Sequence, residues 1–352
     1  MEFFFKPRGI AVIGASANPA KGGYFILHNL LKGFKGGIYP VNPSYAEIDK
    51  LPCYTSVLQV PDPVDLAIIF VPAALVPAVL QECAQRGILG VMIESGGFAE
   101  SGEQGRQLQD RIVNIHKKTG IRIWGPNCMG MVDVPGRKFF TFMSPRIYED
   151  GIIDGRVSLI VQSGMLSAGF LIDIMSHGTM GISKACSIGN KVDVNECDLL
   201  EYLIDDPDTD TICLYLESID NGHRFLELCR RSDKPIVVLK GGKSQQCAKA
   251  AMSHTASMAG NHAVVSAALA QAGVTEAGGF RQLMDLGRTL SMYPDVNSQA
   301  SGRVAVLTFS GAAGIVSSDF IESKGLRLAE LSESSLEMLG EVFPECLPVS
   351  NP

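Results

Sequence analysis

The sequence predicts an α/β protein whose parallel sheets are covered by helices on both faces. Short apolar runs alternate with helical patterns, and small turn residues follow many of the runs, which is typical of repeated βαβ units. At 352 residues the chain is too long for one compact core, so we expect two or three domains. Hydrophobic residues at 46% and charged residues at 19% are typical of a globular protein with large cores.

Charge and cysteine usage exclude several classes of protein. The formal net charge is −7 and no run of lysine or arginine forms a basic patch, so we expect no nucleic-acid partner. Nine cysteines are scattered without a C-x-x-C pair, which indicates a reducing compartment and predicts no metal site. No apolar stretch reaches the roughly 20 residues of a membrane span. We therefore expect a cytoplasmic protein.

The first domain is predicted to cover residues 1–134. Its apolar runs end in turns and alternate with helical stretches, which is the order of a doubly wound nucleotide-binding fold. A linker over residues 135–156, rich in turn residues and expected to contain a small hairpin, follows it. The predicted strands are Gly9–Ile13, Gly37–Pro40, Leu66–Val71, Val91–Ser95 and Ile121–Trp124.

A second α/β domain is predicted over residues 157–296, and its opening pattern recurs. The segment VSLIVQSGMLSAG from Val157 matches VAVLTFSGAAGIV from Val304, so residues 302–352 are expected to begin a third domain of similar fold. Two strands and two helices bury too little apolar surface to be stable alone. Either this part docks on its neighbours or, as we favour, the chain is a fragment. The second domain's predicted strands are Val157–Val161, Lys184–Ser187, Thr211–Leu216 and Pro235–Leu239.

The turn after the first predicted strand, Gly14–Pro19, lies where open α/β sheets bind phosphate-bearing ligands. NAD is disfavoured, because Ser16 replaces the second glycine of the dinucleotide fingerprint. The end of the second strand also lacks the carboxylate that binds the NAD ribose, since residues 39–43 read YPVNP. A glycine-rich turn without any ligand remains an open alternative.

Four further strand ends of the first domain carry turn residues that face the same edge of the sheet. They indicate a long ligand lying across the carboxyl ends of several strands. Cys128, in the last of these turns, has no histidine partner that the sequence can place, so we interpret it as a wall residue rather than a nucleophile or metal ligand. The four turns are Asn42-Pro43, Val71-Pro72, Ser95–Gly97 and Gly125–Cys128.

In the second domain, the stretch GGKSQQCAKAAMSHTASMAGN follows the last predicted strand and carries His254. A histidine among small residues on a loop can act as a mobile nucleophile towards phosphorus. Its second ring nitrogen then needs a carboxylate to fix the tautomer, and Glu217, at the end of the strand Thr211–Leu216, could supply it. From the residues alone, a structural role for His254 is not excluded.

Ser163-Gly164 follows a strand and opens a helix, so its backbone amides could hold a phosphate. A serine-hydrolase elbow is disfavoured, because Val161 stands at the leading glycine position of that motif. Asn190, in the segment SIGN, is a further candidate for the same phosphate pocket.

The motifs IAVIGAS, YPVNP, IFVPA, ESGGF, GPNCMG, VQSGMLSAG, SIGN and MSHTASMAG occur in this order. Their succession resembles the NDP-forming acyl-CoA synthetases, close to ADP-forming acetyl-CoA synthetase and related to the succinyl-CoA synthetase α subunit. The resemblance covers essentially the whole chain. It implies a Rossmann-like CoA-binding domain, a flavodoxin-like domain with a phosphohistidine loop, and the start of a second flavodoxin-like domain.

The resemblance also implies roles for individual residues. Inorganic phosphate attacks the acyl-CoA to give an acyl phosphate and free CoA, and His254 then takes the phosphoryl group. Glu217 would orient His254, and the helix start at Ser163-Gly164 would hold the phosphate. Cys128 would lie near the CoA thiol. The positions that match the family's CoA contacts are Gly14, Ser16, Lys21, Asn42, Val71, Pro72, Ser95, Asn127 and Cys128.

One part of the family pattern is missing, because the sequence contains no ATP-grasp region. The resemblance therefore implies that ADP or ATP and Mg²⁺ bind only through an ATP-grasp β subunit or C-terminal domain, and that this chain alone catalyses a partial reaction. It further implies a homodimer or an α₂β₂ assembly. The main alternative is the CoA-sensing regulatory region of a protein lysine acetyltransferase. Because many such regions lack the reactive histidine, the presence of His254 and Glu217 favours the enzyme.

Overall fold

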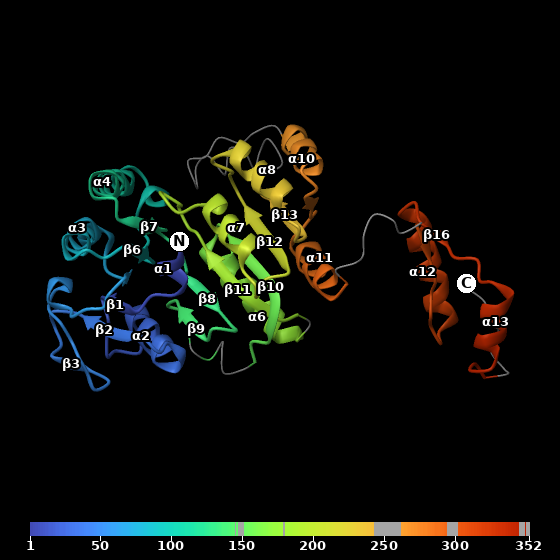
Figure 1. Cartoon of the computed structure of the whole chain (residues 1–352), viewed down its shortest axis with the longest axis horizontal. Helices are drawn as coiled ribbons and strands as arrows, with labels where there is room; N and C mark the ends of the chain where they lie inside the picture. The colour runs from blue at the N-terminus through green and yellow to red at the C-terminus, as the bar shows by residue number, and fades with distance from the viewer. Residues whose placement is uncertain are drawn as a thin grey trace. The chain divides into compact units, whose positions relative to one another are not determined.

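The computed structural model describes residues 1–144, 146, 151–178, 180–242, 262–293, 302–344 and 349. It confirms the predicted α/β class. The chain forms two compact units, Met1–Met292 and Tyr293–Pro352 (Figure 1). In the described residues, no helix is long and apolar enough to cross a membrane.

The first sheet of the larger unit has five parallel strands in the order β2-β1-β5-β6-β7. All five strands lie where the sequence predicts them. Helix α2 covers one face, while α3 and α4 cover the other. The strands are β1 (Gly9–Ile13), β2 (Gly37–Val41), β5 (Leu66–Ile69), β6 (Gly90–Ile93) and β7 (Arg122–Trp124), and the helices are α2 (Gly22–Gly33), α3 (Val76–Arg86) and α4 (Glu103–Thr119).

Short elements complete this part of the fold. Helix α1 (Glu2–Phe5) precedes the sheet, and strands β3 (Glu47–Ile48) and β4 (Leu51–Pro52) form a small hairpin. Three single turns of 3₁₀ helix lie in the connections: η1 (Val57–Gln59), η2 (Ala73–Leu75) and η3 (Ala99–Ser101).

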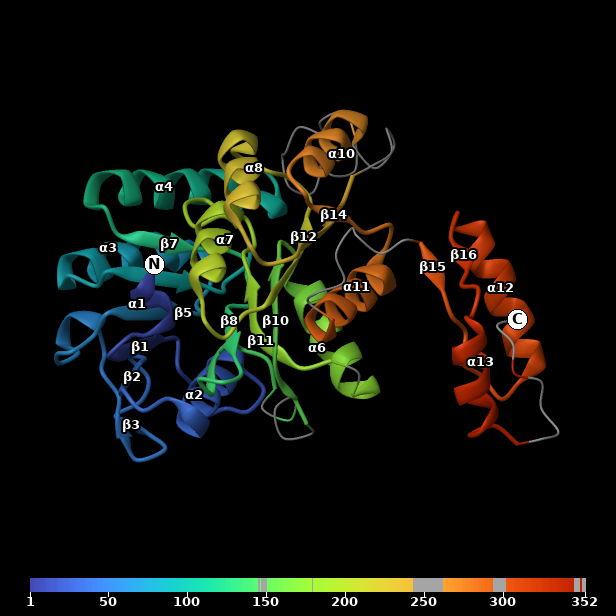
Figure 2. The same ribbon diagram turned by 45° about the vertical axis from the view of Figure 1, so that its right-hand side comes forward.

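The second sheet has seven strands in the order β14-β13-β12-β10-β11-β8-β9. Helices α6 and α11 cover one face, and α7, α8 and α10 cover the other (Figure 2). The strands are β8 (Met131–Asp133), β9 (Lys138–Phe140), β10 (Asp154–Val161), β11 (Ile182–Ser187), β12 (Thr211–Leu216), β13 (Ile236–Lys240) and β14 (Thr275–Glu276). The helices are α6 (Gly164–His177), α7 (Glu196–Asp205), α8 (Gly222–Arg231), α10 (His262–Gln271) and α11 (Phe280–Met292).

The hairpin β8–β9 differs from the sequence interpretation, which placed residues 131–134 at the end of the first domain and the hairpin in the linker. In the structure, β8 pairs antiparallel with both β9 and β11. The hairpin therefore forms the edge of the second sheet. Met131 and Phe140 are fully buried there, and burying these side chains requires the partner strand β11, which lies about 50 residues further along the chain.

Aromatic side chains join the two sheets into one unit. Phe4 and Phe5 of α1 are fully buried, and both pack edge-on against Trp124 at ring distances of 5.4 and 5.8 Å. Phe5 also stacks on Tyr202 of α7 at 3.7 Å. The Trp124 indole donates a hydrogen bond to the Ser187 carbonyl oxygen at 2.6 Å. Burial of such aromatic surface is strongly stabilising, so the two sheets have a fixed relation.

The smaller unit repeats the opening of the second sheet in miniature. Parallel strands β15 (Arg303–Val304) and β16 (Arg327–Leu328) accompany helices α12 (Gly311–Ser323) and α13 (Glu333–Gly340). The Ser310 hydroxyl caps α12 by accepting from the Ala313 amide, as the Ser163 hydroxyl caps α6 by accepting from Leu166. The strand, Ser-Gly turn and helix recognised twice in the sequence therefore form twice in the structure.

Candidate active site

A cavity of about 660 Å³ lies at the carboxyl ends of the first sheet's strands. Its volume is in the range of small-molecule sites. Seven of the nine residues that the sequence analysis matched to CoA contacts line it, and Asn127 and Cys128 do not. The lining residues are Gly14, Ser16, Ala20, Lys21, Gly22, Gly23, Asn42, Phe70, Val71, Pro72, Ser95 and Gly96.

Close backbone contacts build the turn between β1 and α2. Gly14 has a φ of +91°, and a Cβ there would lie 2.2 Å from the Phe70 carbonyl oxygen. A Cβ on Gly23 would lie 2.0 Å from the Gly14 carbonyl oxygen. The helix start can therefore approach the turn only because both residues are glycines. This leaves the first-turn amides of α2 at the cavity, where a helix N-terminus favours an anion.

Polar side chains hold the rest of the cavity wall. The Asn42 amide donates to the Ala15 carbonyl oxygen at 2.7 Å, and the Ser16 hydroxyl accepts from the Asn18 amide at 3.0 Å. The Ser95 hydroxyl accepts from the Val71 amide at 3.0 Å. Lys21 is exposed at the start of α2, so its ammonium can reach a bound anion.

Asn127 and Cys128 belong to the neighbouring turn after β7. The Asn127 amide donates to the Ser95 carbonyl oxygen at 3.0 Å, which ties this turn to the cavity wall. The Cys128 thiol is 2% exposed and donates to the Ile93 carbonyl oxygen at 3.4 Å. Burial raises the pKa of Cys128, with the nearby Glu94 adding to the effect. A thiol held neutral in this way is a packed, buried group and a poor nucleophile.

The sequence analysis passed over Glu94, which stands inside the turn motif ESGGF and directly precedes Ser95 of the cavity wall. Its side chain is buried, and neither carboxyl oxygen has a hydrogen-bond partner among the described residues. Burial raises the pKa of Glu94 well above its usual value. Folding therefore favours the protonated, neutral form of this carboxyl.

This proton makes stability depend on pH in a predictable direction. Above its usual pKa, Glu94 is ionised in the unfolded chain but stays protonated in the folded one, so stability falls as pH rises towards the raised folded pKa. Glu94→Gln should therefore match the wild type near pH 4 and become progressively more stable than it towards pH 8. Thermal unfolding across this range measures the difference, and a gap that does not change with pH would contradict the assignment.

The start of α6, at Ser163-Gly164, lies against the turn that contains Cys128. A Cβ built on Gly164 would lie 3.8 Å from the Met129 backbone nitrogen and 3.9 Å from the Ser187 hydroxyl. The same hydroxyl accepts from the Met129 amide at 3.0 Å. The predicted phosphate site of the second domain is therefore a direct neighbour of the first domain's turn at residues 125–128.

Glu217 directly follows β12, and a second residue that sequence reasoning missed fixes its backbone. The Gln162 side-chain oxygen accepts from the Glu217 amide at 2.8 Å and from the Ser218 amide at 3.0 Å. The Lys240 ammonium donates to the Glu217 carbonyl oxygen at 2.6 Å. Gln162 immediately precedes Ser163, so one buried side chain sets the spacing between the α6 start and Glu217. The signal in the sequence that could have identified Gln162 is its place as a polar residue at the end of an apolar strand.

The Tyr215 hydroxyl donates to the Glu217 carboxylate at 3.4 Å. Burial raises the pKa of Tyr215 to about 12, with the Glu217 charge contributing. The phenol therefore stays protonated as a donor. His254 lies outside the described residues.

Asn190 follows β11, and its side chain bonds to residues of the first domain. Its amide donates to Glu100 at 2.6 Å and to Gln109 at 2.9 Å. The structure thus brings together Ser163, Gly164 and Glu217 through Gln162, and it places Asn190 among residues of the first domain.

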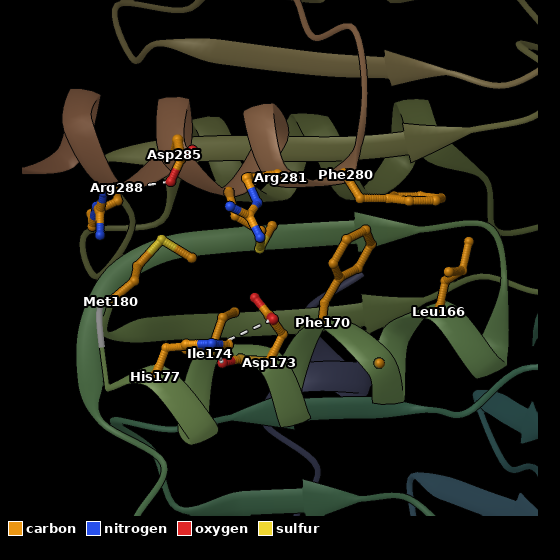
Figure 3. A pocket seen from close by; sticks show the side chains of 12 residues that line it. Leu166, Phe170, Asp173, Ile174, His177, Met180, Phe280, Arg281, Asp285 and Arg288 are labelled. Atoms are coloured by element: carbon orange, nitrogen blue, oxygen red, sulfur yellow. Dashed lines mark hydrogen bonds and ion pairs between the residues drawn. The ribbon is translucent and has the colours of Figure 1, made fainter. Parts of the chain in front are cut away.

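A separate groove of about 440 Å³ lies between α6 and α11. Phe170 and Phe280, which line it, pack edge-on at a ring distance of 5.6 Å, and Asp173, Arg281 and Arg288 also line it (Figure 3). It contains no residue that the sequence analysis assigned to a site. In the described ranges, no group of three or more His, Cys, Asp or Glu side chains is placed to hold a metal ion.

Two family models match the chain. Residues 8–133 match the CoA binding domain, and residues 154–290 match the succinyl-CoA ligase like flavodoxin domain. The two matched ranges contain the 660 Å³ cavity and the α6–Glu217 site, respectively.

Full-length relatives extend the match. The α subunit of acetate–CoA ligase [ADP-forming] II of Pyrococcus furiosus is 39% identical over all of this chain, which covers 75% of that subunit. Acetate–CoA ligase [ADP-forming] II of Archaeoglobus fulgidus is 40% identical over 99% of the chain, which spans 51% of that protein. This chain thus corresponds to about half of one relative and three quarters of the other.

A solved structure agrees with these relatives. The dinucleotide-forming acetyl-coenzyme A synthetase 1 of Ca. Korarchaeum cryptofilum, in complex with phosphate and ADP, superposes with a TM-score of 0.90 at 36% identity. The match covers 100% of this chain and 74% of that one. On its sequence, its two domain types and its fold, the chain belongs to the ADP-forming acetate–CoA ligase family.

Proposed function

We propose that this chain is the CoA-binding and phosphohistidine-carrying part of an acid–thiol ligase that converts acyl-CoA, phosphate and ADP to carboxylate, CoA and ATP. The observation that carries the proposal is the cavity at the first sheet, lined by seven of the residues matched to CoA contacts and adjacent, through residues 125–129, to the start of α6. Membership of the ligase family supports the reaction type. The regulatory alternative gains no support from these relatives, which are named as ligases.

The chemistry divides into two steps on this chain. Inorganic phosphate displaces the CoA thiolate from acyl-CoA, so a P–O–C bond forms as the thioester bond breaks, and the thiolate takes up a proton. The His254 ring nitrogen then attacks phosphorus, and the carboxylate leaves. The amides at Ser163-Gly164 hold the phosphate. The Glu217 carboxylate accepts a hydrogen bond from the other His254 ring nitrogen, which keeps its proton.

Delivery of the phosphoryl group to ADP needs an ATP-grasp region, supplied by a β subunit or a further domain, which would also bind Mg²⁺. The relatives that are longer than this chain are consistent with such a partner. We assign residues 1–134 to the CoA-binding domain, whose last strand β8 pairs into the second sheet, residues 157–296 to the ligase domain and residues 302–352 to a third domain. A homodimer or an α₂β₂ assembly follows from the family resemblance.

The CoA site is tested by charge reversal at its rim. Lys21→Glu should raise the Kd for CoA about tenfold at low salt, because an attraction for the CoA phosphates becomes a repulsion, and the effect should shrink as salt is added. Isothermal titration of the chain with CoA measures this. Lys35→Glu, a matched reversal on an exposed lysine beyond the other end of α2, should leave the Kd unchanged.

Two results would overturn the CoA site. One is a wild-type chain that does not bind CoA, or that binds NAD as tightly. The other is an equal loss of affinity in Lys21→Glu and Lys35→Glu, which would place the ligand elsewhere on the surface.

A further inference from the structure

Every polar atom of the Asn190 side chain is used in contacts with the first domain. Its amide nitrogen donates to the Glu100 carboxylate at 2.6 Å and to the Gln109 side-chain oxygen at 2.9 Å. Its side-chain oxygen accepts from the Asn127 amide group at 3.3 Å. The Asn190 backbone amide also donates to the Pro126 carbonyl oxygen at 2.8 Å. The segment after β11 thus supports the turn after β7.

Asn127 lies between Asn190 and the cavity wall. Its φ is +57°, in the left-handed region that asparagine adopts more readily than most other non-glycine residues. Its amide donates to the Ser95 carbonyl oxygen at 3.0 Å, and a Cβ on Gly96 would lie 3.2 Å from its side-chain oxygen. Ser95 and Gly96 line the 660 Å³ cavity. The contacts of Asn190 therefore reach the cavity wall through one residue.

Glu100 makes the strongest of these contacts. Its other carboxylate oxygen accepts from the Gly97 and Phe98 amides at 2.7 and 3.0 Å. Burial alone would raise the pKa of Glu100, but the hydrogen bonds from Asn190 and from these amides lower it more. An ionised acceptor makes a stronger hydrogen bond than a neutral one. Glu100 thereby joins Asn190 to the turn that directly follows Ser95 and Gly96.

We propose that Asn190 is a positioning residue for the CoA site, which holds Asn127 and the 125–128 turn in place, and that it is not a phosphate ligand. Its side-chain donors and acceptor are already engaged with three residues of the first domain, and none of these contacts involves Ser163 or Gly164. The inference rests on the proposed function, since it takes the cavity to be the CoA site.

The two half-reactions separate this role from phosphate binding. Phosphorylation of His254 by acetyl phosphate needs no CoA, whereas CoA titration involves no phosphate transfer. In Asn190→Ala, the Kd for CoA should rise about tenfold, because a hydrogen-bonded support is lost. The KM for acetyl phosphate and the phosphorylation rate should stay at the wild-type values.

The reverse pattern, a raised KM for acetyl phosphate with an unchanged Kd for CoA, would overturn the inference and restore Asn190 as a phosphate ligand. Equal losses in both measurements would overturn it too, because they would indicate a general packing defect. A wild-type chain that fails to bind CoA would refute the proposed function itself. The wild-type titration therefore distinguishes the two failures.

A rescue variant guards against misfolding. Asn190→Asp puts a carboxylate against Glu100 at the position of a 2.6 Å hydrogen bond, so CoA affinity should fall at least as far as in Asn190→Ala. Adding Glu100→Gln supplies an amide that can donate to the introduced carboxylate. The Gln109 amide can flip to donate as well, with loss of the weak 3.4 Å hydrogen bond that its oxygen accepts from the Ala99 amide. The double variant should return to within about threefold of the wild-type Kd. No recovery in the double variant would contradict a role that acts through these hydrogen bonds.

Discussion

His254→Asn should abolish acid-labile phosphorylation of the chain by acetyl phosphate while leaving the Kd for CoA unchanged. Asparagine has a similar reach but no ring nitrogen that can form a bond to phosphorus. The cavity proposed to bind CoA is lined by residues of the first domain alone, so the substitution should not disturb it. Mass spectrometry under neutral conditions, with acid treatment as the check, measures the phosphoryl group.

The carboxylate at Glu217 should be nearly as important. Glu217→Gln keeps the backbone contacts with Gln162 and Lys240 but removes the charge that fixes the histidine tautomer. Positioned proton acceptors of this kind contribute about 10²- to 10⁴-fold to rate, so phosphorylation should slow by at least about 10²-fold.

A matched histidine on the same domain provides the control. His223 on α8 has a side chain that is 92% exposed. The His223→Asn variant should be phosphorylated by acetyl phosphate to the same extent as the wild type. Persistent labelling of His254→Asn would show that another group carries the phosphate. A loss of CoA binding in the same variant would show that the substitution acts through the fold.

Lys191→Met should cause the largest loss of stability. The Lys191 ammonium contacts Glu196 at 2.8 Å, Asp220 at 2.9 Å and the Ser218 carbonyl oxygen at 3.0 Å. The Lys191 and Glu196 side chains are 4% and 0% exposed. Removing the ammonium leaves Glu196 buried with an uncompensated charge, which costs about 3–5 kcal/mol. Denaturant unfolding of the chain measures the change.

The paired substitution tests the cause of this loss. Glu196→Gln in the Lys191→Met background removes the orphaned charge and should recover a large part of the stability. Lys6→Met, which breaks an exposed pair with Glu2, should cost less than about 1 kcal/mol. A loss below about 1 kcal/mol in Lys191→Met, or no recovery in the double variant, would refute a buried ion pair at this position.

This ion pair also bears on the chemistry, because it anchors the residues that follow Glu217. The Glu196 carboxylate accepts from the Asp220 amide at 2.8 Å. Ser218 and Asp220 are therefore held from one side by Lys191 and Glu196, and Glu217 and Ser218 from the other side by Gln162. The position of Glu217 thus depends on residues at the ends of three other strands: Gln162 after β10, Lys191 after β11 and Lys240 of β13.

Much of the 660 Å³ cavity could be predicted from the sequence, because parallel strands place all their carboxyl ends at one edge of a sheet. Once the strands before Gly14, Asn42, Val71 and Ser95 are recognised, the turns that follow them must converge. The second sheet was harder. β8 pairs with β11 across about 50 residues, and no local pattern specifies an antiparallel partner at that distance.

Individual side chains were predicted less well where burial and long-range contacts decide their role. Glu94 lies in a motif of turn residues, and only the packing around it shows a neutral carboxyl. Gln162 stands between an apolar strand and the Ser163-Gly164 turn, but no local pattern shows that it fixes Glu217 from 55 residues away. The order of strand ends predicts that Asn190 lies near Ser163. Its side chain instead donates to Glu100, which lies 90 residues earlier in the chain.

The most direct test joins both sites in one experiment. The chain is incubated with acetyl-CoA and radiolabelled phosphate, and label on His254 is compared with released CoA thiol. The account predicts acid-labile label on His254, dependence on both reactants, and release of at least one thiol for each labelled chain. Label that appears without acetyl-CoA, or thiol release with no label on a chain that binds CoA, would contradict it.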